Sequence, residues 1–199
     1  MPILGTIASS KLQSISSDFE SIASYTVSGS STGTITFSSI PSTYRNLQLR
    51  CSWLASSATT GGATLQIRIN GDTASNYNYL QGLANMSDDS VKNTGAMTGQ
   101  TEFKNDTGYL GFTTADSTTS FSIDILDIHE YKNTLIKKPI LWRQARNKNT
   151  TSHPTSRISI TSGHWASTSA ITSIEIKVYA PASSNFAADS TFDLYGIGG

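Results

Sequence analysis

Three histidines and one cysteine are the residues of this 199-residue chain best suited to metal or acid–base chemistry. His129, His153 and His164 are 24 and 11 positions apart, and the single cysteine is Cys51. Zinc sites are usually built on close pairs such as Cys-x-x-Cys or His-x-x-x-His, and the sequence contains neither. We therefore predict that the chain holds no metal and no cofactor.

The carboxylates give no sign of a catalytic pair. Asp124 and Asp127 are three positions apart in a predicted strand, so their side chains should point to opposite faces. A hydrolase acting on polysaccharide needs two carboxylates that face each other across a groove, and the sequence shows no such pair. Glycine-rich phosphate loops of the G-x-x-x-x-G-K and G-x-G-x-x-G types are absent as well. We predict that the chain is not an enzyme and has no catalytic residues.

Basic residues gather in one stretch although the whole chain is neutral, with 14 Lys and Arg against 14 Asp and Glu. No acidic residue occurs between Tyr131 and Ile174. This stretch is either a solvated loop or a basic surface that docks on an acidic partner, for which complementary charge would set the orientation. Its candidate contact residues are Lys137, Lys138, Arg143, Arg146 and Lys148.

Two aromatic clusters could bind a sugar, because lectin-like sandwiches present aromatic faces beside amide side chains. The clusters are Asn76-Tyr77-Asn78-Tyr79 and Gly163-His164-Trp165. Tyr77, Tyr79 and Trp165 are the glycan-contact candidates. The competing interpretation, that these rings pack in the core or against another subunit, is the stronger one.

Serine and threonine dominate the composition, with 32 and 26 residues or about 29% of the chain. Threonine favours strands, and serine competes with the helical backbone for hydrogen bonds. Alternation of apolar and polar residues, typical of half-buried strands, marks four segments with the apolar set expected on the core side. They are Leu47–Trp53, Leu65–Asn70, Phe121–Leu126 (with Phe121, Ile123 and Ile125 as the apolar set) and Ile174–Tyr179.

Some eight to ten strands in a chain of this length predict an all-β fold, a single antiparallel β-sandwich that is jelly-roll-like. Residues 1–20 would form an extended N-terminal arm for anchoring or subunit contact, and residues 21–199 the sandwich. A short helix at Leu12–Ala23 and a helical turn within Asp72–Leu83 are the alternatives to an all-strand assignment. Further strands are expected at Tyr25–Val27, Thr34–Phe37, Tyr109–Thr113, Leu135–Trp142, Arg157–Thr161 and Thr191–Ile197.

Several classes of protein are excluded at this stage. A nucleic-acid binder would show an excess of basic residues, and a transmembrane helix would need a run of about 18 apolar residues; the sequence has neither. Cys51 alone cannot form an internal disulfide. The first residues lack the basic and long apolar regions of a signal peptide. We expect a protein made in a cytoplasm, with no nucleic acid and no membrane as partners.

Blocks at both ends of the chain resemble a known family. The chain opens with Met1-Pro-Ile-Leu-Gly-Thr-Ile-Ala-Ser-Ser and continues with Phe19-Glu-Ser-Ile-Ala. These stretches, with those below, resemble the small virion structural proteins of tailed bacteriophages, among them capsid decoration and fibre-like proteins. Residues 85–105 and 132–169 match the family weakly. The remaining blocks are Ile35–Arg50, Ile69–Tyr77, Ile171–Ile174 and Asn185–Ile197.

The resemblance implies a function and a set of partners. It implies a non-enzymatic virion protein assembled in a bacterial cytoplasm, and we expect a capsid decoration or cement protein that binds the major capsid protein or another virion protein. A homotrimer is expected from the class. The alternative is a tail or head-fibre adhesin that binds a receptor or glycan. In the N-terminal arm the candidate contact residues are Met1, Pro2, Ile3, Leu4 and Ile7.

Overall fold

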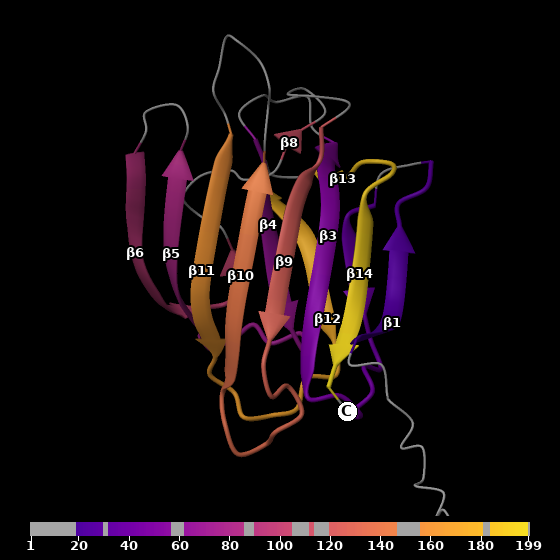
Figure 1. Ribbon diagram of the computed structural model, residues 1–199, viewed down its shortest axis with the longest axis vertical. Helices are drawn as coiled ribbons and strands as arrows, with labels where there is room; N and C mark the ends of the chain where they lie inside the picture. Colours follow the sequence, from indigo (N-terminus) through magenta and orange to yellow (C-terminus); the bar gives the residue numbers. More distant parts are fainter. Residues whose placement is uncertain are drawn as a thin grey trace, which may run out of the picture.

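The protein is built from strands that form two packed sheets (Figure 1). Its structure is a computed structural model that describes residues 19–29, 32–56, 62–85, 90–104, 112–113, 120–146, 156–180 and 184–198. Every regular element in those ranges is a strand. The predicted all-β sandwich is thereby confirmed at the level of two face-packed sheets, which are antiparallel apart from one short parallel pairing.

The larger sheet forms the front layer in Figure 1. Two short strands, β13 (Asn185–Phe186) and β8 (Phe112–Thr113), pair with its β3 outside the main run. The main run contains, in spatial order, β1 (Phe19–Thr26), β14 (Thr191–Ile197), β3 (Asn46–Ser56), β9 (Ser122–Ile128), β10 (Lys138–Arg146), β11 (Arg157–Trp165), β5 (Tyr77–Asn85) and β6 (Ser90–Gln100).

The smaller sheet lies behind the first, and the hydrophobic core fills the space between the two. Leu47, Leu49, Cys51 and Trp53 of β3 all face this core, as their alternation predicts. The core residues predicted in the other two segments, Leu65, Ile67 and Ile69 and then Ile174, Ile176 and Val178, are also buried. The strands of the smaller sheet are β2 (Thr34–Phe37), β12 (Ile174–Ala180), β4 (Thr64–Ile69) and β7 (Phe103–Lys104).

The predicted phase of β9 is wrong. Ile123 and Ile125 lie on the outer face, while Ser122, Asp124 and Leu126 face the core. The helical alternatives are wrong wherever the chain is described, because Phe19–Thr26 and Tyr77–Asn85 are strands. The strand expected to start at Leu135 starts at Lys138, and β6 was not predicted at all.

Asp124 explains the phase of β9, because its carboxylate is fully buried and held by three side-chain donors. The indole Nε1 of Trp53 lies 2.5 Å from Oδ2, and that of Trp142 lies 2.9 Å from Oδ1. The amide Nε2 of Gln144 donates to Oδ1 at 2.7 Å. Burial nevertheless dominates and raises the pKa of Asp124 to about 6, against the opposing effect of these hydrogen bonds.

We expect Asp124→Asn to change how the stability of the protein depends on pH. The pKa of Asp124 is higher in the native state than in the unfolded state, so the native state binds this proton more tightly. The protonated carboxyl therefore adds to the stability of the fold at low pH. This contribution should be lost as pH rises from about 4 to about 6, by about 3 kcal/mol. In Asp124→Asn this loss should be absent, because the amide does not titrate in this range. Urea unfolding of both proteins from pH 4 to 8 tests this; parallel stability curves would contradict it.

Candidate interaction surface

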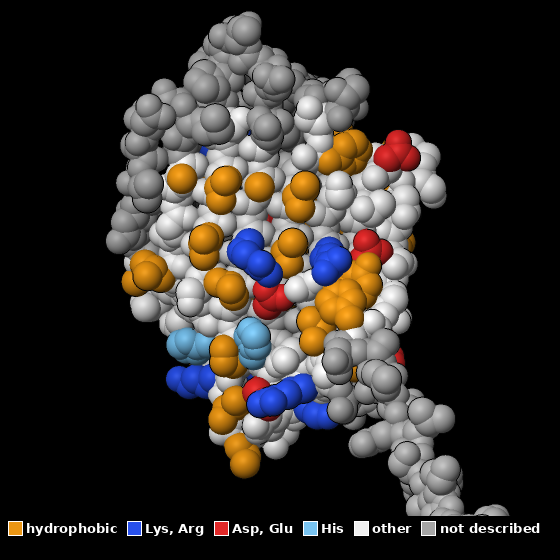
Figure 2. Space-filling model, viewed as in Figure 1, with side chains coloured by type: hydrophobic (Ala, Val, Ile, Leu, Met, Phe, Trp, Pro, Cys, Tyr) orange, Lys and Arg blue, Asp and Glu red, His pale blue; other side chains and the backbone are white. Residues whose placement is uncertain are grey.

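The outer face of the large sheet carries rows of apolar side chains (Figure 2). The first row crosses four strands, because Ile158 of β11 pairs with Ala84 of β5 and with Ala145 of β10, which pairs with Ile123 of β9. Ile160 and Ile125 flank Arg143 in the second row. Leu80 and Leu141 lie in the third, on either side of Ser162. The rows lie over β5, β11, β10 and β9 and make up the apolar patch, in which the polar residues Ser162, Arg143 and Asp127 also lie.

Four of these side chains are strongly exposed, whereas Ile125, Leu141 and Ala145 are partly exposed. The exposed fraction is 60% for Ile158, 55% for Ile123, 54% for Ile160 and 49% for Leu80. The solvent face of an antiparallel sheet is normally polar, and a chain so rich in Ser and Thr has polar strand formers in abundance. Four isoleucines on the solvent side of β11 and β9 therefore make this face a candidate interaction surface.

A small polar network interrupts the patch beside its centre. Arg143 Nη2 lies 2.5 Å from Asp127 Oδ2, and Gln48 donates to the other oxygen of that carboxylate at 2.6 Å. Arg50 donates in turn to Gln48 Oε1 and lies over the rings of Phe19 and Tyr195. The outward Asp127 and the buried Asp124 confirm that the two carboxylates point to opposite faces.

A second exposed apolar feature lies at the end of the sheet, in the loop that joins β9 to β10 and extends past the ends of the strands in Figure 1. Leu135 is 87% exposed, and its neighbour Ile136 is exposed as well. Lys132 and Lys137 are exposed beside them. The one carboxylate of the loop, that of Glu130, is paired with Arg45 at 2.5 Å. We call Lys132–Lys137 the loop tip.

A buried lysine, Lys138, holds the loop tip in place from the side of the sheet. The ammonium of Lys138 donates to the carbonyl oxygens of Asn133, of Ile136 at 2.7 Å and of Thr168 at 3.0 Å. The side-chain oxygen of Asn133 accepts the backbone N–H of Leu135 at 2.9 Å. Desolvation lowers the pKa of Lys138. The tip is therefore a fixed structure that displays its apolar residues without collapsing them onto the sheet.

The basic candidates do not form one surface. Lys138 and Arg146 face inward from β10 and are buried, which corrects the prediction that they contact a partner. Arg143 lies on the outer face and Lys137 on the loop tip, at different parts of the molecule. Lys148 lies outside the described residues, as do Met1, Pro2, Ile3, Leu4 and Ile7.

The glycan candidates are core residues. Tyr77, Tyr79 and Trp165 are all buried, so none offers a ring face to a sugar in solvent. Tyr77 stacks edge-on against Phe103. Trp165 donates from its indole to Asp72 at 2.7 Å. Their placement supports the packing interpretation, and an adhesin would need another surface for its ligand.

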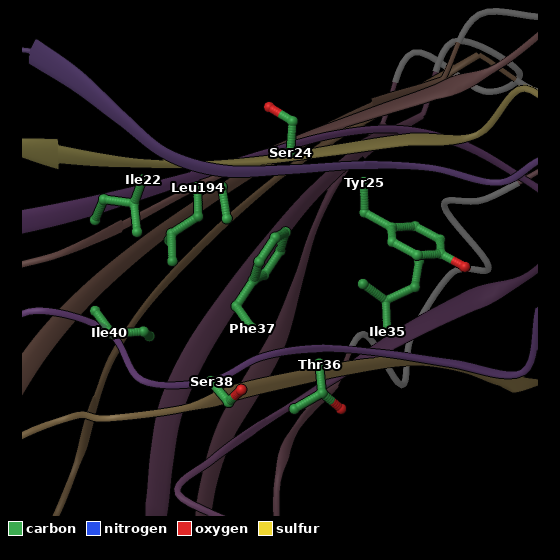
Figure 3. Close-up of a pocket in the computed structure, with 10 residues that line it drawn as sticks. Ile22, Ser24, Tyr25, Ile35, Thr36, Phe37, Ser38, Ile40 and Leu194 are labelled. Atoms are coloured by element: carbon green, nitrogen blue, oxygen red, sulfur yellow. The ribbon is translucent and has the colours of Figure 1, made fainter.

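A groove opens between the two sheets where β1 and β2 form their edges (Figure 3). Its volume is about 280 Å³. Ile22 and Leu194 from the large sheet point toward Phe37 and Ile40, whereas Ser24 points away. Tyr25 is the one titratable residue among the described lining residues, which also include Ser24, Thr36 and Ser38, so this lining holds no acid–base pair.

The residues that could carry catalysis remain scattered. No group of three metal-ligating side chains occurs within the described ranges, and His153 lies outside them. His164 lies 3.5 Å from the amide of Asn78 beside a shallow hollow on the outer face, and desolvation lowers its pKa. Residues 29–33 have the letters of the serine-hydrolase elbow, G-x-S-x-G, and the serine of that motif, Ser31, lies outside the described residues. That motif needs a helix after it, and here β2 follows.

Comparisons of the chain with protein-family models, with curated proteins and with solved structures find no match. In the described part of the chain no helix has the length and apolar character needed to cross a membrane.

We expect Lys138→Met to loosen the loop tip, because three carbonyl oxygens would lose their shared donor. The free energy of unfolding should fall by roughly 2–3 kcal/mol, and hydrogen exchange of the amides at residues 133–137 should accelerate. Lys137→Met is the matched control, since that side chain is exposed on the same loop. Equal exchange in both variants would show that Lys138 does not hold the tip.

Proposed function

We propose that this protein is a non-enzymatic structural component of a tailed-bacteriophage virion, a decoration protein that docks on the shell of major capsid proteins. The observation that carries the proposal is the loop tip, a fixed apolar pair flanked by cations at one end of the sandwich. The sequence resemblance is the reason for placing the protein in a phage particle, and the loop tip is the surface through which we propose that it attaches.

The chemistry of the loop tip defines what it would bind. Leu135 and Ile136 fit an apolar pocket, and Lys132 and Lys137 fit carboxylates at its rim. Burying one leucine side chain stabilises a contact by about 1.5–3 kcal/mol. Because Lys138 already fixes the loop, little conformational entropy remains to be lost on docking. Many copies on a shell would multiply such modest contacts.

The strand order supports the jelly-roll-like part of the proposal. Four strands of the large sheet, in the order β1-β14-β3-β9, face the small sheet in the order β2-β12-β4-β7. The chain passes from one sheet to the other between β1 and β2, β2 and β3, and β3 and β4. This alternation is typical of the eight-stranded jelly roll, an architecture of viral capsid domains. Strands β10, β11, β5 and β6 would then widen one sheet of that framework.

Leu135→Asp should weaken attachment to phage heads that lack this protein. A carboxylate at the tip cannot enter an apolar pocket and would be repelled by an acidic rim. We expect the apparent affinity for added heads to fall at least about tenfold, measured by co-sedimentation of purified protein with the heads.

Thr34→Asp on the outer face of the small sheet is the matched control, because Thr34 is also exposed and its cross-strand partner is Lys177. Full binding of the control with loss for Leu135→Asp supports docking through the tip. Full occupancy by Leu135→Asp would contradict it.

Deleting Met1–Ser10 tests the N-terminal arm separately. If the arm anchors the protein, the truncated chain should remain a folded sandwich by circular dichroism while its incorporation into particles is lost. Decoration of expanded heads at full occupancy by the truncated chain would eliminate the arm as an anchor and leave the loop tip as the attachment site.

A further inference from the structure

We infer that the outer face of the large sheet binds the same face of a second copy of this chain. The patch lies on strands of the sheet, away from the loop tip, and its occupant is argued from its own charge, shape and size. This inference goes beyond the proposed docking on a shell and does not depend on it.

The charge of the face suits a copy of itself. Its described charged residues are Arg143 and Arg50 against Asp127 and Asp193, two of each sign. Arg143 pairs with Asp127 at 2.5 Å, and Arg50 lies directly across the strands from Asp193. A strongly acidic or basic partner would gain nothing from such a face. A two-fold contact can place the cations of each copy near the anions of the other.

The shape of the face suits sheet-on-sheet packing. Its apolar side chains form rows at the pleat spacing of adjacent antiparallel strands, because Ile158 aligns with Ala145 and Ile123. Two such faces can interdigitate at the small angle usual for stacked sheets. The contact would repeat, between two molecules, the packing that already joins the two sheets within one molecule.

The size of the face suits a weak dimer. Four strands about 4.8 Å apart and three rows about 6.8 Å apart span roughly 400 Å² as a flat projection. Side-chain relief makes the accessible area larger than this projection. Two faces together therefore bury about 800 Å² or more, which is the size of weak and transient protein interfaces. We expect a weak dimer in place of the homotrimer expected from the resemblance.

Sedimentation of the purified full chain tests the inference. The wild-type protein should be a dimer that dissociates on dilution, and Ile158→Lys combined with Ile160→Lys should weaken it at least about tenfold because ammonium groups would be buried without partners. Thr34→Lys combined with Thr36→Lys, on the exposed side of the small sheet, should leave it unchanged. Unfolding curves of both double variants check that each is folded.

Cysteine cross-linking identifies the face directly. The natural Cys51 is buried, and burial raises its pKa, so an introduced cysteine would be the reactive thiol. A bis-maleimide reagent that spans two thiols some distance apart should give a covalent dimer of Ile160→Cys, whereas Thr36→Cys should remain a monomer. These two substitutions lie on the outer faces of the two different sheets.

Three outcomes would overturn the inference. They are a monomer up to the highest soluble concentration, an oligomer that the Ile158 and Ile160 substitutions do not weaken, and cross-linking at Thr36 in place of Ile160. Each uses the isolated protein, so none bears on whether the loop tip binds a phage head.

Discussion

The carboxylate of Asp124, held between the sheets by two indoles and an amide, fixes the register on which the rest of the structure depends. Trp53, Asp124 and Trp142 come from three adjacent strands, so their hydrogen bonds lock β3, β9 and β10 to one another. In a strand, fixing one inward side chain fixes every other one. With Asp124 inward, Ile123 and Ile125 must point outward. The outward position of Ile123 and Ile125, the part of the apolar outer face on β9, is therefore a direct consequence of a polar site in the core.

Strand β10 connects the Asp124 site in the core with the loop tip at the end of the sheet. Trp142 and Gln144 face inward and bind Asp124, and Lys138 faces inward from the same strand four residues before Trp142. Its ammonium then holds the loop tip from below. On the opposite side of the strand, Leu141 and Arg143 belong to the outer face. One strand thus positions both surfaces, through the alternation of its side chains.

The sequence predicted the sheets well because three of its four alternating segments bury the residues expected from their polarity. It failed for β9, where both residue sets are partly apolar: Ile123 and Ile125 outward, Leu126 and Ile128 inward. Hydrophobicity alone cannot choose between two such phases, and the choice depends on indole donors that are distant in the chain. The burial of Lys138 could have been predicted, since it is two residues before Ile140 and four before Trp142 and therefore lies on the same inward face of the strand. The exposure of Leu135 could not, because it depends on the ammonium beneath the loop.

The two surfaces can operate together because they lie on perpendicular directions of the sandwich. A second copy that covers the outer face approaches along the normal of the large sheet, whereas the loop tip points along the strands, beyond their ends. Pairing therefore leaves the tip accessible. If the two-fold axis of the pair runs along the strands, both tips lie at the same end and can engage one shell together. Two linked weak contacts bind far more tightly than either alone, so self-association would strengthen attachment without any change at the tip.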